Sequence, residues 1–359
     1  MLEMLRNLIS MFLSFELAIS GMFTGLDVNK QYEMPEVETG EYTQYVDPFI
    51  GTGGTPWTCG MLSPAATTPF GLVRLGADTS FLGGAYILKT NTSGYYYEHG
   101  HIQGFSHSRL SGTGAEDYEM FRVTPAIGNK KAGVLAFSHE NETAVPGYYA
   151  VYLPTIDCLA ELTSTAHAGV HRYTFNGGDV RAIVIDLKHT VAAPDEIFKS
   201  SNFKVVSDTE IQGYKNTDAF VPDQHQYFSA RFSEPFTAEI LSDAYALLTF
   251  APEVKEVTAA VSLSAVSYEN AQANGLAEVP VLDFDKVKAE AHAAWVEEMD
   301  DIVVKGGTKE QDKLIRRLER EIEKQEQVVA SFDAKIEAAS ADYQELTRLL
   351  GEKEEAELL

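Results

Sequence analysis

Short runs of aromatic and β-branched residues, each ended by a turn signal, recur through the middle of the chain. They occupy 147–153, 169–175, 181–187, 227–232 and 246–250, with Gly, Pro, Asn or Asp residues between them. Many short strands at this spacing, with few helical stretches among them, predict a mainly β fold built as an antiparallel β-sandwich. A further run, 257–264, alternates apolar and polar residues, which predicts one buried and one wetter face.

Charge and composition narrow the range of partners. The chain has 359 residues and a formal net charge of −25, and 45% of its residues are hydrophobic. This length holds one large domain or two smaller ones, and the apolar content argues against wholesale disorder. The negative charge disfavours a nucleic-acid partner or an acidic membrane surface, because Lys and Arg bind both. The two cysteines are too few for a disulfide framework or a four-cysteine zinc site.

The N-terminal region, 1–44, is interpreted as a possible signal peptide followed by a linker. Its apolar stretch, 8–15, is too short to span a bilayer, and no other segment of the chain could do so. Arg6 before the stretch and small residues after it fit a secretory signal, whereas Glu3 and Glu16 count against one. A working signal would place the protein in a periplasm or outside the cell. A frayed or mis-started N-terminal extension is the alternative.

Between 51 and 117 the chain is dense in glycine and small polar residues, with aromatic residues among them. Loops of this kind on a rigid sheet commonly carry binding chemistry. Aromatic rings suit the C–H face of a sugar, and polar side chains suit its hydroxyls. Trp57 and Tyr96 are therefore candidates for stacking on a sugar. The candidates for hydroxyl recognition are His107, Arg109, Glu116 and Asp117. Alternatively, His107 and Arg109 brace the loops.

Other chemistries find less support in this region. The segment 51–54 lacks the Gly-Lys-Ser/Thr that completes a phosphate loop, and no Gly-x-Ser-x-Gly elbow presents a nucleophile. His99, His101 and His107 could bind a metal ion, but no other ligand stands nearby at a suitable spacing. Glu116 and Asp117 could form an acid/base pair, although adjacent side chains usually point apart. No metal ligand, general acid or general base is assigned.

Six segments of the sequence together resemble one enzyme family. They are YVDPFIGTGG (45–54), PFG (69–71), GFSHSRLSGTG (104–114), FSHENET (137–143), PGYY (146–149) and HRYTF (171–175). In this order they resemble the N-terminal domain of glycoside hydrolase family 92, over about 45–307. The resemblance implies a β-sandwich whose loops form one wall of the active site of a secreted, calcium-dependent exo-α-mannosidase. Mannose-containing glycans are the implied partners.

In that family a C-terminal (α/α)6 barrel forms the other wall and carries the calcium site and the carboxylates for hydrolysis with inversion. Here we expect the sandwich over 45–283 and a linker helix region over 284–308, but the barrel does not follow. The sequence therefore predicts no cofactor for this chain, with calcium expected only alongside the barrel. It also predicts no glycosidase activity for the chain alone, so whether it counts as an enzyme stays open.

The tail, 309–359, has a different composition, with 9 basic and 14 acidic residues and no proline. Mostly apolar residues follow one another in it at spacings of three and four, which indicates a coiled coil or helical hairpin. They are Ile315, Leu318, Ile322, Gln325, Val329, Phe332, Ile336, Ala339, Tyr343, Leu346 and Leu350. The tail also resembles the coiled-coil hairpin of ABC-F-type ATPases. Self-association through this coiled coil is a further expectation.

Two other interpretations of the whole chain remain. It could be a non-catalytic carbohydrate-binding or structural sandwich that the coiled coil oligomerises. It could also be a truncated or chimeric reading frame, since the composition changes near 306–308, where a junction could lie.

Overall fold

The computed structural model describes most of the chain up to residue 301. The described residues are 27–28, 30–40, 42–54, 61–81, 92–112, 121–127, 134–177, 181–190, 197–219 and 221–301, with 317, 322, 324, 335 and 348. The chain divides into two compact units, Met1–Asp301 and Ile302–Leu359. The predicted signal peptide and the predicted coiled coil lie outside the described residues, apart from those five isolated positions, and both stay predictions.

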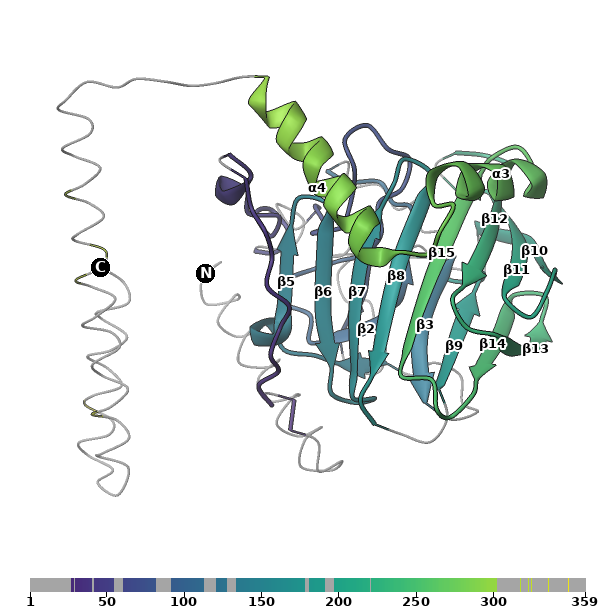
Figure 1. The fold of residues 1–359 in the computed structure, drawn as a ribbon, viewed down its shortest axis with the longest axis horizontal. Coiled ribbons are helices and arrows are strands. Elements are labelled where there is room, and N and C mark those ends of the chain that lie inside the picture. Colours follow the sequence, from purple (N-terminus) through teal and green to yellow (C-terminus); the bar gives the residue numbers. More distant parts are fainter. Residues whose placement is uncertain are drawn as a thin grey trace. The chain divides into compact units, whose positions relative to one another are not determined.

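Two antiparallel sheets form the first unit (Figure 1), as the strand pattern predicts. One has the order β1-β2-β3-β9-β14-β13, with β4 paired to β2. Its strands are β1 (Gly76–Ser80), β2 (His101–Ser106), β3 (Arg122–Ile127), β4 (Leu135–Ala136), β9 (Arg181–Asp186), β13 (Phe236–Ser242) and β14 (Tyr245–Phe250).

The second sheet has eight strands in the order β10-β11-β12-β15-β8-β7-β6-β5. They are β5 (Glu142–Val145), β6 (Tyr148–Leu153), β7 (Cys158–Ser164), β8 (Ala168–Phe175), β10 (Phe198–Val205), β11 (Glu210–Thr217), β12 (Gln224–Phe232) and β15 (Glu256–Ser264). Two short 3₁₀ helices, η1 (Thr43–Tyr45) and η3 (His139–Asn141), precede β1 and β5.

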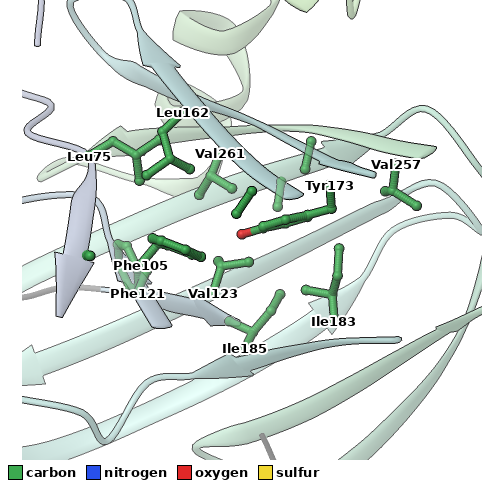
Figure 2. Packing of buried hydrophobic residues seen from close by; sticks show 14 of the residues in the cluster. Leu75, Phe105, Phe121, Val123, Leu162, Tyr173, Ile183, Ile185, Val257 and Val261 are labelled. Atoms are coloured by element: carbon green, nitrogen blue, oxygen red, sulfur yellow. The ribbon is translucent and has the colours of Figure 1, made fainter. Parts of the chain in front are cut away.

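The core lies between the two sheets, where side chains from both interdigitate (Figure 2). Alternation along the strands selects them: Ile183 and Ile185 of β9 point into this core, while Val184 between them belongs to a separate cluster. Each fully buried side chain of this size contributes about 1.5–3 kcal/mol. Figure 2 labels Leu75, Phe105, Phe121, Val123, Leu162, Tyr173, Ile183, Ile185, Val257 and Val261.

The predicted wetter face of 257–264 is wrong. In β15 every residue after Glu256 is buried, including the polar Ser262. The reason is that helix α3 (Tyr268–Glu278) packs on the outer face of β15 and β12, with Gly275 directly over Ser262. Ser262 then satisfies its hydroxyl by donating to the carbonyl of Ser229, 3.0 Å away.

Helix α4 (Phe284–Asp300) begins where the linker helix is expected, with Asp283 as N-cap. It packs on the outer face of β6–β8 through Phe284, Val287 and Ala291. The segment 30–40, interpreted as linker, lies against the same sheet. There the ring of Tyr32 stacks on that of Tyr152, with centroids 4.1 Å apart.

None of the helices in the described part of the chain is long and apolar enough to cross a membrane.

Candidate functional site

A cleft of about 470 Å³ lies where three loops meet beside the start of β5. We call it the loop cleft. Its lining combines backbone, aromatic rings and carboxylates. The lining residues are Asp47, Phe49, Ile50, Gly51, Thr52, Gly53, Gly54, Tyr97, Glu98, His139 and Glu142. A concave site with a few fixed polar groups is the usual form of a small-ligand site.

The loop 47–54 owes its shape to local hydrogen bonds and to glycine. The Asp47 carboxylate accepts from the Phe49 amide at 2.9 Å, and the Thr52 hydroxyl donates to the Phe49 carbonyl at 2.8 Å. Gly51 has φ +79°, and a Cβ there would lie 2.6 Å from Leu62 Cδ1. A Cβ on Gly53 would lie 2.7 Å from Tyr97 Cβ. The glycine-rich sequence therefore permits both the turn and the close approach of Tyr97.

Glu142 joins three side chains on one wall of the loop cleft. Its carboxylate accepts from Tyr95 Oη at 3.0 Å, from Tyr149 Oη at 2.6 Å and from His139 Nδ1 at 2.6 Å. Burial and then the charge of Glu142 raise the pKa of Tyr95 and Tyr149 well above the ordinary value, so both phenols stay donors. Three donors on one carboxylate fix its position.

The hydrogen bonds of His139 favour its imidazolium form. Its Nδ1 donates to Glu142 and its Nε2 donates to the Tyr97 carbonyl at 2.6 Å, and neither partner can itself donate. Burial alone would lower the pKa of His139. The hydrogen bond and charge of Glu142, the Tyr97 carbonyl and the charge of Glu98 outweigh burial, and the pKa is raised. The contacts of His139 therefore favour its positively charged form beside the Glu142 carboxylate.

Tyr97 presents the exposed aromatic surface of the loop cleft. Its ring stacks on His139, with centroids 4.0 Å apart and planes 7° from parallel, and 40% of the residue is exposed. The rings of Phe49 and Tyr97 make a T-shaped contact, with centroids 6.0 Å apart. A cation stacked on one face of an aromatic ring fixes the orientation of the ring and leaves its other face available to a ligand.

Glu98 has one occupied and one unoccupied carboxylate oxygen. Oε1 accepts from the Gly54 amide at 2.8 Å, which ties Glu98 to the glycine loop. Oε2 is buried and has no hydrogen-bond partner among the described residues. An unsatisfied buried acceptor is costly, so a hydroxyl that reaches Oε2 would gain a strong hydrogen bond.

One of the predicted site residues, Tyr96, lies directly behind the loop cleft. Tyr96 is 1% exposed, and its hydroxyl donates to the Gly54 carbonyl, so it supports the glycine loop from within. Trp57, Glu116 and Asp117 lie outside the described residues. The substrate-binding role of all six predicted residues stays a prediction.

Arg109 and His107 are also buried. Arg109 forms an ion pair with Asp78 at 3.2 Å and donates to the carbonyls of Gly76 and Ser93 at 2.6 and 2.8 Å. His107 Nδ1 donates to the Phe121 carbonyl at 2.6 Å, and its Nε2 accepts from His171 Nε2 at 2.7 Å. Burial lowers the pKa of His107 to about 4, and burial together with the charge of His107 lowers the pKa of His171 well below its ordinary value, so both rings are neutral at pH 7. These contacts brace the loops.

The sequence interpretation missed Glu98, His139 and Glu142 as site residues. The sequence did contain a signal for these residues, because His139 and Glu142 lie in segment 137–143 of the family resemblance, and Glu98 follows the aromatic run 95–97. The sequence alone does not show the fold, which brings residues as far apart as Asp47 and Glu142 to one cleft.

The described residues do not suit a metal ion. Among them there is no group of three or more His, Cys, Asp or Glu that could hold one. His99, one of the three weighed as zinc ligands, is buried and bonds Thr79 Oγ1 at 3.0 Å, and burial lowers its pKa to about 3. No calcium site is built from these residues either, and calcium binding alongside the barrel stays a prediction.

Comparison with known proteins places this geometry in a family. The model of the glycosyl hydrolase family 92 N-terminal domain matches residues 45–276. The structure of a family GH92 alpha-mannosidase from Bacteroides thetaiotaomicron aligns with a TM-score of 0.64 and 29% identity, over 76% of this chain and 40% of that one. The same enzyme in complex with mannoimidazole aligns with a TM-score of 0.63 and 30% identity, over 74% and 38% of the two chains.

A curated relative agrees. An uncharacterized secreted glycosidase from Arthroderma benhamiae is 26% identical over an alignment 325 residues long, which covers 78% of this chain and 40% of that protein. The chain thus spans about 40% of the length of the relatives it matches. The resemblance inferred from the motifs is confirmed, and the chain belongs to glycosyl hydrolase family 92, whose N-terminal domain it contains.

Proposed function

We propose that the sandwich forms the substrate wall of an exo-α-mannosidase and that the loop cleft receives a terminal mannosyl unit of an α-linked glycan. Membership of family 92 supports this, as do the mannosidases and the mannoimidazole complex among the related structures. The name of the curated relative supports a location outside the cell.

The observation that carries the proposal is the pairing of Tyr97 with fixed polar groups in one cleft. Tyr97 offers an exposed ring face, while Glu98 Oε2 offers an acceptor without a partner in the described region. His139 adds a positive charge whose position Glu142 sets. A pyranose has an apolar C–H face and a rim of hydroxyls, and this arrangement complements both.

Cleavage of the glycosidic bond needs further groups. Hydrolysis with inversion uses one carboxylic acid and one carboxylate about 6.5–9.5 Å apart, with a water molecule between the base and the sugar. In the loop cleft, Glu142 is saturated by three donors, and Glu98 is bound to the Gly54 amide. We therefore assign these residues to positioning and recognition. In this proposal the catalytic carboxylates and the calcium ion are supplied by the C-terminal barrel of the family, and we expect residues 1–359 on their own to release no mannose.

Calorimetric titration of the purified chain with α-1,2-mannobiose tests the proposal. Wild type should bind in the millimolar range, and Tyr97→Ala or Glu98→Gln should weaken binding about tenfold. Tyr45→Ala is the matched control, because Tyr45 is 80% exposed and does not line the loop cleft. Equal binding by wild type and both cleft variants would overturn the assignment of the site. Calcium-dependent mannose release by the chain would overturn the assignment of catalysis to the barrel.

A further inference from the structure

A second cluster of aromatic side chains lies on the outer face of the eight-stranded sheet. It consists of Tyr214 in β11, His225 and Tyr227 in β12, and Tyr268, the first residue of α3. We call these four residues the tyrosine platform. Tyr214 pairs directly with Tyr227 in the strand register, so both point to the same face. Phe228, next to Tyr227, belongs to the core, which places the tyrosines on the outer face.

The four rings contact one another in series. The centroids of His225 and Tyr214 are 5.9 Å apart, those of Tyr214 and Tyr227 are 4.9 Å apart, and those of Tyr227 and Tyr268 are 5.0 Å apart. All three tyrosines are partly exposed. Contact between rings fixes their orientations before any ligand arrives, which lowers the entropy cost of binding.

Polar groups surround these rings at fixed positions. Tyr214 Oη donates to His225 Nδ1 at 2.7 Å, and His225 Nε2 faces the Asp223 carboxylate at 3.3 Å. On the other side, the Tyr268 hydroxyl donates to the side-chain carbonyl of Asn202 in β10. The side chains of His225 and Asp223 are 43% and 68% exposed. Their hydrogen-bonding groups therefore lie within reach of a bound molecule.

The tyrosine platform is remote from the loop cleft. Strand β12 and strand β5, where Glu142 lies, are five strand positions apart in the sheet order. At about 4.8 Å for each strand, they are roughly 24 Å apart. Figure 1 shows β10–β12 and α3 at the opposite edge of this sheet from β5.

Charge indicates the class of ligand. Asp223 contacts His225 and the charge of Glu269 acts on Tyr268, while the whole chain carries a net charge of −25. Lys199 and Lys204 lie near enough to act on the charges of Asp223 and Glu269 respectively, so positive and negative charges offset each other around the rings and favour a neutral ligand over an anionic one. We propose that the tyrosine platform is a second glycan-binding surface, which holds a stretch of a neutral polysaccharide against the rings. It does not depend on the loop cleft binding mannose. Occupation of both surfaces by one polymer would raise the apparent affinity without any new contact.

Affinity electrophoresis through gels containing soluble mannan, mixed-linkage glucan or xylan tests this inference. At least one polymer should retard wild type, and the double variant Tyr214→Ala/Tyr227→Ala should bind it about tenfold more weakly. Tyr45→Ala, an exposed tyrosine that belongs to neither surface, is the matched control and should keep the wild-type retardation. Retention of full retardation by the double variant would overturn the inference. Retardation in a gel that contains polylysine, with no retardation in a gel that contains any of the three glycans, would also overturn the inference.

Hydroxyl-radical footprinting of wild type gives a second measurement that needs no variant. The retarding polymer should lower the oxidation of Tyr214, Tyr227 and Tyr268, and α-1,2-mannobiose should protect Tyr97 instead. This separates the two surfaces, because failure of the loop cleft to bind mannobiose leaves protection of the tyrosine platform unchanged. Equal oxidation of the three tyrosines with and without polymer would contradict the inference. Tyr268→Phe, which removes only the hydroxyl bound to Asn202, serves if the double variant does not fold.

Discussion

Two neighbouring regions of this molecule use the same residue types for opposite purposes. Behind the glycine loops, Arg109, Asp78, His107 and His171 form a buried polar layer in which every partner belongs to the chain. In the loop cleft, His139 and Glu142 are equally well bonded but border open space. Tyr96 and Tyr97 are adjacent in sequence, yet one is 1% exposed and the other 40%. Chemical type alone therefore does not identify the residues that meet a ligand.

The largest predicted effect belongs to the buried polar layer. Arg109→Met would leave the buried Asp78 without its guanidinium partner, with only Ser106 and His189 beside it, and would free the carbonyls of Gly76 and Ser93. We expect a loss of about 3–5 kcal/mol in the free energy of unfolding, measured by urea denaturation. Arg74→Met is the matched control, since Arg74 is exposed and should cost less than about 0.5 kcal/mol. Similar losses for both variants would show that the buried polar layer is not special.

Acid should weaken the buried polar layer. The pKa of His107 is about 4 in the folded chain and about 6.5 when unfolded, so the unfolded chain binds more protons between these values. This contribution to stability is complete above pH 6.5 and is lost as the pH falls toward 4, by about 3 kcal/mol in all. Unfolding curves at pH 7 and at pH 4.5 measure it.

The double variant His107→Leu/His171→Leu should depend less on pH in that window than wild type. Replacing the exposed His225 by Ala is the control for removal of a histidine as such. A pH dependence in the double variant that equals that of wild type would contradict the assignment to the buried pair.

His139 in the loop cleft should respond with the opposite sign. Its pKa is raised in the folded chain, so its contribution to stability is complete below the unfolded value near 6.5 and is lost as the pH rises through the folded value. Glu142→Gln removes the main cause. It should lower the pKa of His139, followed by NMR titration of the imidazole, and should cost about 2 kcal/mol. Glu140→Gln, two residues away and partnered by Gln31, should leave that pKa unchanged.

The sequence predicts the β-sandwich better than it predicts the residues that line the loop cleft. Alternating aromatic and β-branched runs predict strands because the side-chain period of a strand is two, and β6, β8, β9, β12 and β14 all fall on the expected runs. The error in β15 came from α3, which covers a polar face that pattern alone assigns to water. Burial on both sides is a property of neighbours, and neighbours distant in sequence leave no local signal.

For the candidate site, the density of motifs indicated the loops that line the loop cleft, but it did not distinguish residues that support these loops from residues that line the cleft. Tyr96 lies in the same motif as Tyr97, and its hydroxyl bonds the very loop that lines the loop cleft. The two neighbouring residues have different contacts. The Tyr96 amide donates to Thr79 Oγ1, whereas the Tyr97 ring stacks on His139. His139 and Glu142 join them only through the fold.

The smallest predicted effect compares these two tyrosines through one identical change. Tyr96→Phe removes a buried donor to the Gly54 carbonyl and leaves that carbonyl without its partner, at a cost of about 1 kcal/mol. Tyr97→Phe removes a hydroxyl from a ring that is 40% exposed and keeps the stack on His139, so its free energy of unfolding should change by less than about 0.5 kcal/mol. Thermal and urea unfolding of both variants in parallel measure the difference. Because the substitution is the same, unequal losses of unfolding free energy can arise only from the different surroundings of the two tyrosines. Equal losses would remove the distinction between a buried tyrosine behind the loop cleft and an exposed one that lines it.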